Sequence, residues 1–167
     1  VPQMRERLFF IGIRNDLNKE PEFPVPKSTM TRIRDVLPNL NNKNLTDTDV
    51  IWIKENTRMK KLWQFTKAGT NFQRAGFELF GKKGSYFGQV KASPDKPCNT
   101  ILTTAMYHWN ECRFLTIPEI KLFSTFPEDF KLTGSFMDKW ERVGRAVPPF
   151  MAKEIAIVLR DKILNKC

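Results

Sequence analysis

Histidine, cysteine and long apolar runs are scarce in this sequence, and each shortage excludes a class of protein. The 167 residues include one histidine, His108, and three cysteines, Cys98, Cys112 and Cys167. The cysteines lack the paired spacing of a zinc site. We therefore expect no metal site, no disulfide scaffold and no hydrolase with its own histidine triad. Reduced thiols instead favour a cytoplasmic protein.

The apolar residues are distributed as in an ordinary globular protein. They make up 41% of the chain, beside 28% charged residues. No segment approaches the roughly 18 consecutive apolar residues that cross a membrane. The first residues also lack the basic and then apolar pattern of a secretory signal. We expect a folded domain, or a lobe of a larger one, with no membrane partner.

Positive charge is the most informative feature of the composition. The chain carries 28 Lys and Arg against 18 Asp and Glu, a net charge of +10. Residues 54–91, here called the basic segment, hold nine of these cations and only two acids, interleaved with aromatic residues and glycines. The nine are Lys54, Arg58, Lys60, Lys61, Lys67, Arg74, Lys82, Lys83 and Lys91. Such a segment favours a polyphosphate-binding surface, because binding releases counterions; the alternative is a solvated basic face.

Several segments carry local signals of secondary structure. Residues 8–13 form a short, continuously apolar run, which predicts a buried strand. Residues 28–37 predict a short helix capped by Ser28 or Thr29. Across residues 63–90 the glycines recur without a helical period, so we predict short strands and exposed loops there.

Two later helices have clearer signals. Thr116 as the N-cap, Pro118 in the first turn and Glu119 at the third position predict a helix that ends near Ser124. A last helix is predicted to begin at Pro148-Pro149 and to run to the end of the chain. Its apolar stripe is broad, so we expect this helix to be buried on more than one face.

Polar residues alternate at the start of the chain. In a strand, Gln3, Arg5 and Arg7 would share one face. Three such donors suit a phosphate, a carboxylate or a base edge, although solvated charges at a sheet edge are the alternative. Residues 144–149, Gly-Arg-Ala-Val-Pro-Pro, predict a glycine turn that feeds the last helix and comes close to a ligand or another backbone.

Four motifs together point to a family. They are Val-Pro-Gln-Met-Arg-Glu-Arg (1–7), Pro-Cys-Asn-Thr-Ile (97–101), Arg-Phe-Leu-Thr-Ile-Pro-Glu (113–119) leading to Phe126-Pro127, and Gly-Arg-Ala-Val-Pro-Pro (144–149). In this order they resemble the C-terminal part of DNA cytosine-5 methyltransferases, and the resemblance spans the whole chain.

The resemblance implies an α+β fold: a target-recognition lobe plus part of an incomplete S-adenosylmethionine-dependent α/β domain. Residues 1–17 would be a strand of the catalytic lobe that carries the Gln-x-Arg-x-Arg motif. Residues 18–133 would form the recognition domain, after a proline-rich crossing at residues 20–27. Residues 134–167 would be the C-terminal turn and helix of the catalytic lobe.

The resemblance also implies base flipping, in which a cytosine leaves the duplex and reacts in a pocket. By the family pattern Arg7 donates to the cytosine oxygen, while Gln3 and Arg5 position it and its surroundings. Thr100 matches a phosphate contact, and Arg145 and Ala146 border the methyl donor. Further DNA contacts are expected in the basic segment, where the loop near Gly81 would read bases in the major groove. These candidates are Lys82, Lys83, Ser85, Tyr86, Lys60, Lys61 and Arg74.

Other family elements are missing from the sequence. It has no Phe-x-Gly-x-Gly loop for the donor, no Glu-Asn-Val triplet and no Pro-Cys nucleophile loop in its proper place. Cys98 follows a proline but sits inside the Pro-x-x-Thr-Ile motif, so we expect a small structural thiol. Arg145 replaces a residue that is usually neutral. Since the donor sulfonium is a cation, either Arg145 points elsewhere or the donor binds weakly.

We therefore expect a chain that is inactive alone and that methylates duplex DNA only with an N-terminal half. S-adenosylmethionine would be bound mainly by that half, which is either a separate subunit or the rest of a longer chain. Isolated, the chain should self-associate through its uncovered apolar surfaces. A bacterial, cytoplasmic and nucleoid-associated enzyme is expected. The alternative is a DNA-binding module without catalytic function.

Overall fold

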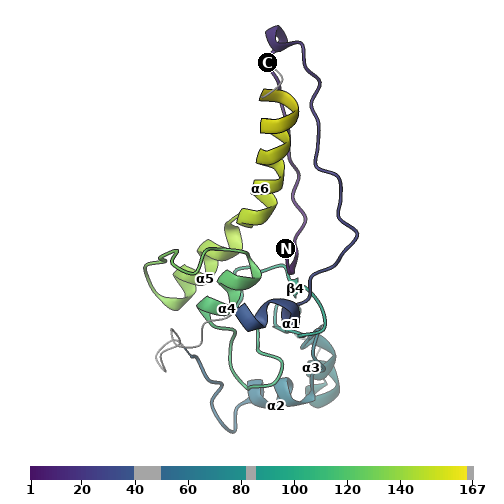
Figure 1. Ribbon diagram of the computed structural model, residues 1–167. Coiled ribbons are helices and arrows are strands. Elements are labelled where there is room, and N and C mark those ends of the chain that lie inside the picture. The colour runs from purple at the N-terminus through teal and green to yellow at the C-terminus, as the bar shows by residue number, and fades with distance from the viewer. Residues whose placement is uncertain (40–49, 82–85, 165–167) are drawn as a thin grey trace.

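Short strands and helices make up the regular structure of the computed structural model, which describes residues 1–39, 50–81 and 86–164 (Figure 1). The helices are α1 (Ile33–Val36), α2 (Arg58–Phe65), α3 (Gln73–Phe80), α4 (Ile117–Phe123), α5 (Phe136–Arg145) and α6 (Pro149–Val158). Single turns of other helix types occupy η1 (Asn15–Leu17), η2 (Leu37–Asn39) and η5 (Leu159–Ile163). The strands are β1 (Gln3–Met4), β2 (Thr70–Asn71), β3 (Val90–Lys91) and β4 (Cys98–Asn99).

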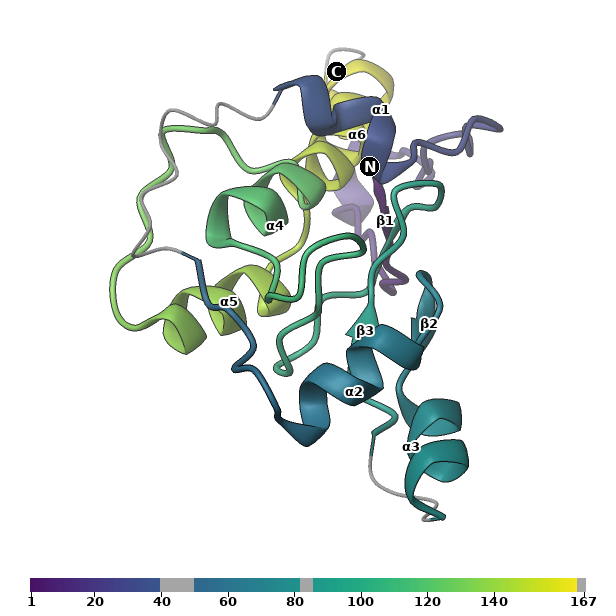
Figure 2. The same cartoon turned by 90° about the horizontal axis from the view of Figure 1, so that it is seen from below.

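The four strands form two separate pairs. β1 lies parallel to β4, with Gln3 opposite Cys98 and Met4 opposite Asn99. β2 lies antiparallel to β3. Figure 2 shows β2 and β3 beside α2, on the side of the molecule away from α4 and α5. The first pair therefore joins distant parts of the sequence, whereas the second belongs to the basic segment alone.

The buried core has two parts. The larger one gathers side chains from α1, β4, α4, α5 and the segments that connect them, among them Phe123, Leu115 and Trp140, each with 0% exposure. The Trp140 indole also donates to the Leu102 carbonyl at 2.8 Å. A smaller cluster holds α2, α3 and Tyr107 together, and Phe114 packs against both clusters. α5 thus packs into the same core as α4.

The start of α4 is as predicted. Thr116 Oγ1 accepts from the Glu119 N–H at 3.3 Å, and the Glu119 carboxylate accepts from the Thr116 N–H at 2.6 Å. Two further bonds, of 2.8 and 2.9 Å, join the Arg113 guanidinium to the same carboxylate. Both charged side chains are buried. The first and last residues of the Arg-x-Leu-Thr-x-x-Glu motif are therefore one ion pair that locks the entry of the helix.

α6 extends away from the rest of the molecule, beside the extended N-terminal segment (Figure 1). It begins at the predicted prolines, and its first turn is held by a bond from the Phe150 N–H to Thr125 Oγ1 at 3.1 Å. Lys27 pairs with Glu154 at 2.8 Å, which fixes the extended segment to the helix. No residue of α6 is buried in the described chain, which agrees with the expectation that this chain alone leaves apolar surfaces uncovered. Among the described residues, no helix is both long and apolar enough to cross a membrane.

The predicted buried strand at residues 8–13 is wrong for this chain. The segment forms no strand, and Leu8 and Phe10 are 80% and 89% exposed. A strand needs a neighbour to accept its backbone hydrogen bonds, and the described residues place no strand beside this one. The apolar pattern therefore marks a surface that this chain does not cover by itself.

The prediction of short strands and loops for residues 63–90, which rested on the recurring glycines, is wrong in part. α3 and the last turn of α2, residues 63–65, were predicted as strands and loops, yet both are helical. Gly76 lies inside α3, where a Cβ would come within 2.5 Å of the Tyr86 ring. Gly81 ends the helix with a left-handed φ of 64°. Gly76 is therefore required for close packing and Gly81 for the end of the helix, and neither marks a long loop.

Two other helices differ from the predictions. α1 begins later than expected, with Arg32 instead of Ser28 or Thr29 as its N-cap, because the Asp35 carboxylate accepts from the Arg32 N–H at 2.8 Å. α5 was not predicted. Its Ser135 and Asp138 bond reciprocally at the N-terminus, a capping pattern that is readable in the sequence.

Candidate functional site

The β1–β4 pair brings two of the four motifs into contact. The Cys98 N–H donates to the Pro2 carbonyl at 2.8 Å, and the Thr100 hydroxyl donates to the Met4 carbonyl. The Pro-Gln-x-Arg-x-Arg motif and the Pro-x-x-Thr-Ile motif therefore lie side by side, although the whole basic segment separates them in the sequence.

Arg5 connects these motifs to a third. Its side chain is buried, and Nη2 donates to the Gly144 carbonyl at 2.6 Å while Nη1 lies 3.4 Å from the Ile101 carbonyl. Gln3 is also buried and donates to the Ser124 hydroxyl at 2.9 Å, at the end of α4. Both residues thus hold backbone segments together from the inside of the molecule.

Arg7 does not share the face of Gln3 and Arg5. It is exposed, and its guanidinium donates to the Glu6 carbonyl at 2.7 Å. The strand pairing stops at Met4, so the alternation that would align three side chains does not reach residue 7. The predicted shared face is wrong for Arg7, whose role in a cytosine pocket stays a prediction.

A cleft of about 510 Å³ lies between the paired motifs and the basic segment. Met4, Asn99, Thr100 and Leu102 line it from the motif side. From the other side it is lined by Gly69, Thr70, Asn71, Phe87 and Gly88, with Val90, Thr104 and Met106 completing the wall. Thr100, predicted from the sequence as a phosphate contact, therefore lies in the cleft. The other lining residues were not predicted, because no local pattern brings these segments together.

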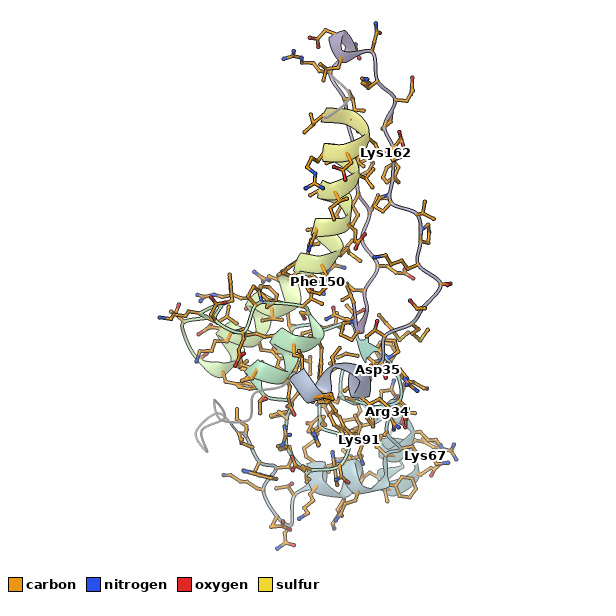
Figure 3. All side chains as sticks on the ribbon, in the orientation of Figure 1. Arg34, Asp35, Lys67, Lys91, Phe150 and Lys162 are labelled. Atoms are coloured by element: carbon orange, nitrogen blue, oxygen red, sulfur yellow. The ribbon has the colours of Figure 1, made fainter. Side chains whose placement is uncertain are left out.

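The cations of the basic segment differ in their surroundings. Lys91 is buried, and its Nζ donates to the carbonyls of Trp63 and Thr66 at 3.0 and 3.1 Å (Figure 3). Burial lowers the pKa of this lysine. Nζ also lies 3.7 Å from the centre of the Trp63 ring. Lys91 is therefore a structural cation that cannot reach DNA.

The candidate DNA contacts fall into four groups. Lys60 pairs with Glu55, and Arg74 pairs with Glu78 at 2.6 Å. Lys61 is exposed on α2 and has no ion-pair partner among the described residues. Tyr86 is half-buried against Gly76. The remaining candidates, Lys82, Lys83 and Ser85, lie outside the described residues.

The predicted edge of the methyl-donor site lies at the end of α5. Arg145 is exposed and pairs with Glu141 of the same helix at 2.5 Å, so its charge is directed along the helix surface. Gly144 is helical rather than part of a turn, and a Cβ there would lie 3.0 Å from the Leu102 carbonyl. An exposed arginine and the half-buried Ala146 do not by themselves form a site for a sulfonium cation. We assign no step of methyl transfer to them.

The thiols and the histidine are not suited to chemistry. Cys98 is fully buried in β4, and burial raises the pKa of its thiol far above the usual range, so no thiolate forms near neutral pH. Burial also raises the pKa of Cys112. Cys167 lies outside the described residues.

His108 is buried. Its Nδ1 accepts from the N–H groups of Asn110 and Glu111 at 3.2 and 2.9 Å, and its ring stacks on Trp109 at 3.8 Å. Burial, with the nearby Arg113, lowers the pKa of His108 to about 4. The imidazole is therefore neutral and structural. Within the described part of the chain, no group of His, Cys, Asp and Glu could hold a metal ion.

Comparison with known proteins agrees with this arrangement of motifs. The sequence model of the family described as C-5 cytosine-specific DNA methylase matches residues 1–160. The Type II methyltransferase M1.HphI of Haemophilus parahaemolyticus is 31% identical over 163 residues, which is 93% of this chain and 43% of the relative. The Type II methyltransferase M.DsaV of Dactylococcopsis salina is 29% identical over 158 residues, again 93% and 43%.

A third relative, M.NgoFVII of Neisseria gonorrhoeae, is 26% identical, and the match covers 93% of this chain and 45% of the relative. The chain thus spans less than half the length of these relatives and corresponds to their C-terminal portion. Its mixed α and β structure with small sheets is compatible with a fragment of a methyltransferase domain. By its sequence match over residues 1–160, the chain belongs to the C-5 cytosine-specific DNA methylases.

Proposed function

We propose that this chain supplies the target-recognition lobe and part of the flipped-cytosine pocket of a DNA cytosine-5 methyltransferase. It would methylate cytosine in duplex DNA together with the N-terminal part of the enzyme. The family uses S-adenosylmethionine as its methyl donor. The observation that carries the proposal is the cleft, where Thr100 and Met4 of two family motifs face residues of the basic segment.

The charges around the cleft support DNA as the ligand. Thr100 offers a hydroxyl in the cleft, and the exposed Lys67 stands two residues before Gly69, which lines it. Arg7 follows Met4 on exposed, extended chain, so its guanidinium is accessible to a base or a phosphate. We assign Arg7 to the cytosine oxygen and Thr100 to a backbone phosphate. Gln3 and Arg5 would hold the framework between them.

The uncovered apolar surfaces support a large protein partner. Leu8 and Phe10 on the extended segment, and Phe150 and Leu164 near the two ends of the last helix, are 59–89% exposed. The relatives contain more than half of their length outside the matched region. We propose that the corresponding N-terminal part covers these side chains and provides the donor site and the nucleophile.

Reconstitution tests this proposal. The chain and the N-terminal part of the Haemophilus relative would be assayed separately and mixed, with tritiated S-adenosylmethionine and duplex DNA. We expect methyl transfer only in the mixture, and weak duplex binding by this chain alone. Turnover by this chain alone would contradict the proposal and would return Cys98 to consideration as the nucleophile. DNA binding without complementation by any family N-terminal part would favour the non-enzymatic module.

A further inference from the structure

The cleft has an unusual lining for a surface that faces DNA. None of the described residues that line it carries a charge. Three large apolar side chains project into it, and Met4, Phe87 and Leu102 are 56%, 72% and 55% exposed. Phosphates are bound by cations and backbone N–H groups, whereas the faces of nucleobases stack on aromatic and apolar groups. The lining therefore fits bases better than backbone.

Phe87 is the most exposed of these side chains and sits at the tip of a fixed turn. The Gln89 N–H donates to the Tyr86 carbonyl at 3.2 Å, so Phe87 and Gly88 are the two central residues of a β-turn. The Gln89 carbonyl accepts from the Phe72 N–H at 2.9 Å, which ties the turn to the start of α3. The aromatic ring is thus presented by a braced backbone.

Tyr86 anchors the other end of this turn. Its ring packs so closely on α3 that a Cβ on Gly76 would come within 2.5 Å of Cδ2. The Arg58 guanidinium lies 4.1 Å from the centre of the Phe80 ring and 5.6 Å from the centre of the Tyr86 ring. These contacts hold Tyr86 against the helices and leave Phe87 directed into the cleft.

We propose that Phe87 stacks on a nucleobase of the bound DNA and that Arg58, Gly76 and Tyr86 position it there. This inference rests on the proposed function, since it requires DNA in the cleft. Tyr86 accordingly acts as an anchor and not as a base-reading residue. An exposed aromatic side chain in an uncharged cleft is stabilised when a base face covers it. Stacking is most favourable on a base that has already left the helix, because the cost of unstacking is then removed.

The test compares two duplexes of the same sequence, one fully paired and one with a single unpaired cytosine. Fluorescence anisotropy would measure their affinities for the 167-residue chain. The wild-type chain should prefer the duplex with the unpaired base. Phe87→Ala should reduce that preference about tenfold, with an unchanged slope of affinity against salt, because no cation is removed. Phe87→Tyr, which keeps the ring, should behave as the wild type.

Matched variants separate positioning from general damage. Phe77→Ala removes a phenylalanine that is 53% exposed on α3 and does not line the cleft, so it should leave both affinities unchanged. Gly76→Ala should displace the Tyr86 ring and reduce the preference for the unpaired base in the same direction as Phe87→Ala. Tyr86→Phe should have no effect, since the anchor is the ring.

The outcomes distinguish this inference from the proposed function. If the wild type binds DNA but Phe87→Ala retains the full preference, the inference fails and the proposed function stands. If the wild type binds no duplex, both fail. If Phe87→Ala binds DNA normally but no longer associates with the N-terminal part, Phe87 belongs to a protein interface and the stacking role is wrong.

Discussion

Two apolar regions of this chain differ in how far their side chains are buried. The core region, formed by α1, β4, α4 and α5, buries apolar side chains within the chain, and Trp140 and Phe123 are fully covered. The flank, formed by residues 7–13 and α6, is similarly apolar, yet Phe10 and Phe150 are 89% and 59% exposed. The difference separates groups that stabilise this chain alone from groups that need another surface. Each prediction below tests whether a residue stabilises this chain by itself or acts at a surface that another molecule covers.

The largest expected effect comes from the core region. Trp140→Ala removes a fully buried indole and its bond to Leu102, and we expect it to lower the free energy of unfolding by about 3–5 kcal/mol. Phe150→Ala in the flank should change it by less than about 0.5 kcal/mol in the isolated chain. Urea unfolding followed by circular dichroism measures both. Similar losses in the free energy of unfolding for the two variants would contradict the distinction between the core region and the flank.

Acid should destabilise the core region through His108. Burial lowers the pKa of His108 from 6.5 to about 4. Between these pH values the unfolded chain binds a proton at His108 and the folded chain does not. Stability should therefore fall as the pH drops from about 6.5 to 4, by up to about 3 kcal/mol. In His108→Gln this fall should flatten between pH 6.5 and 4.5. Below that, protonation of Glu119, whose pKa is lowered by Arg113, adds a further loss. An equally steep fall in the variant would exclude His108 as its source.

Substituting Arg7, in the flank, should reduce activity, whereas substituting Arg5, beside the core region, should reduce stability. In a reconstituted enzyme, Arg7→Ala should lose a charge-assisted bond to the base, worth about 1.5–3 kcal/mol, so that methyl transfer falls at least about tenfold while the melting temperature is unchanged. Arg5→Ala should instead lower the melting temperature, because it frees the Ile101 and Gly144 carbonyls. Normal turnover by folded Arg7→Ala protein would remove Arg7 from the pocket.

The smallest effect concerns the cations of the basic segment. Lys82→Ala together with Lys83→Ala should reduce the slope of log affinity against log salt by up to about two. Lys61→Ala with Lys67→Ala, which removes two exposed cations of the described chain, should act in the same way. Lys91→Met should leave the slope unchanged, because Lys91 is buried. A reduced slope in Lys91→Met would mean that this lysine reaches DNA after all.

The helix-start signals of α4 and α6 predicted local structure correctly. The start of α4 was predicted because Thr116 and Glu119 each bond to the other's backbone within one turn. The start of α6 at its two prolines was also predicted, because proline favours the first turn of a helix. The motif series also identified the family, since it depends on residue identity and order rather than on packing.

What the sequence could not predict depends on contacts between distant segments. Gly76 resembles a helix breaker until the Tyr86 ring is seen against it. Gln3 gives no sign that its partner is Ser124. Residues 8–13 have the composition of a buried strand, but burial depends on a neighbour that the described chain does not provide. No pattern in the basic segment distinguishes the buried Lys91 from the exposed Lys67.

The parallel pairing of β1 and β4 has a consequence for how new specificities can arise. β1 and β4 are neighbouring strands, about 4.8 Å apart, so the long stretch of chain between them, residues 6–96, leaves and returns at one strand pair. A segment with adjacent ends can be exchanged for another without moving the strands that flank it. Recombination in this stretch could therefore replace one recognition surface by another while the Arg5 and Thr100 contacts are kept.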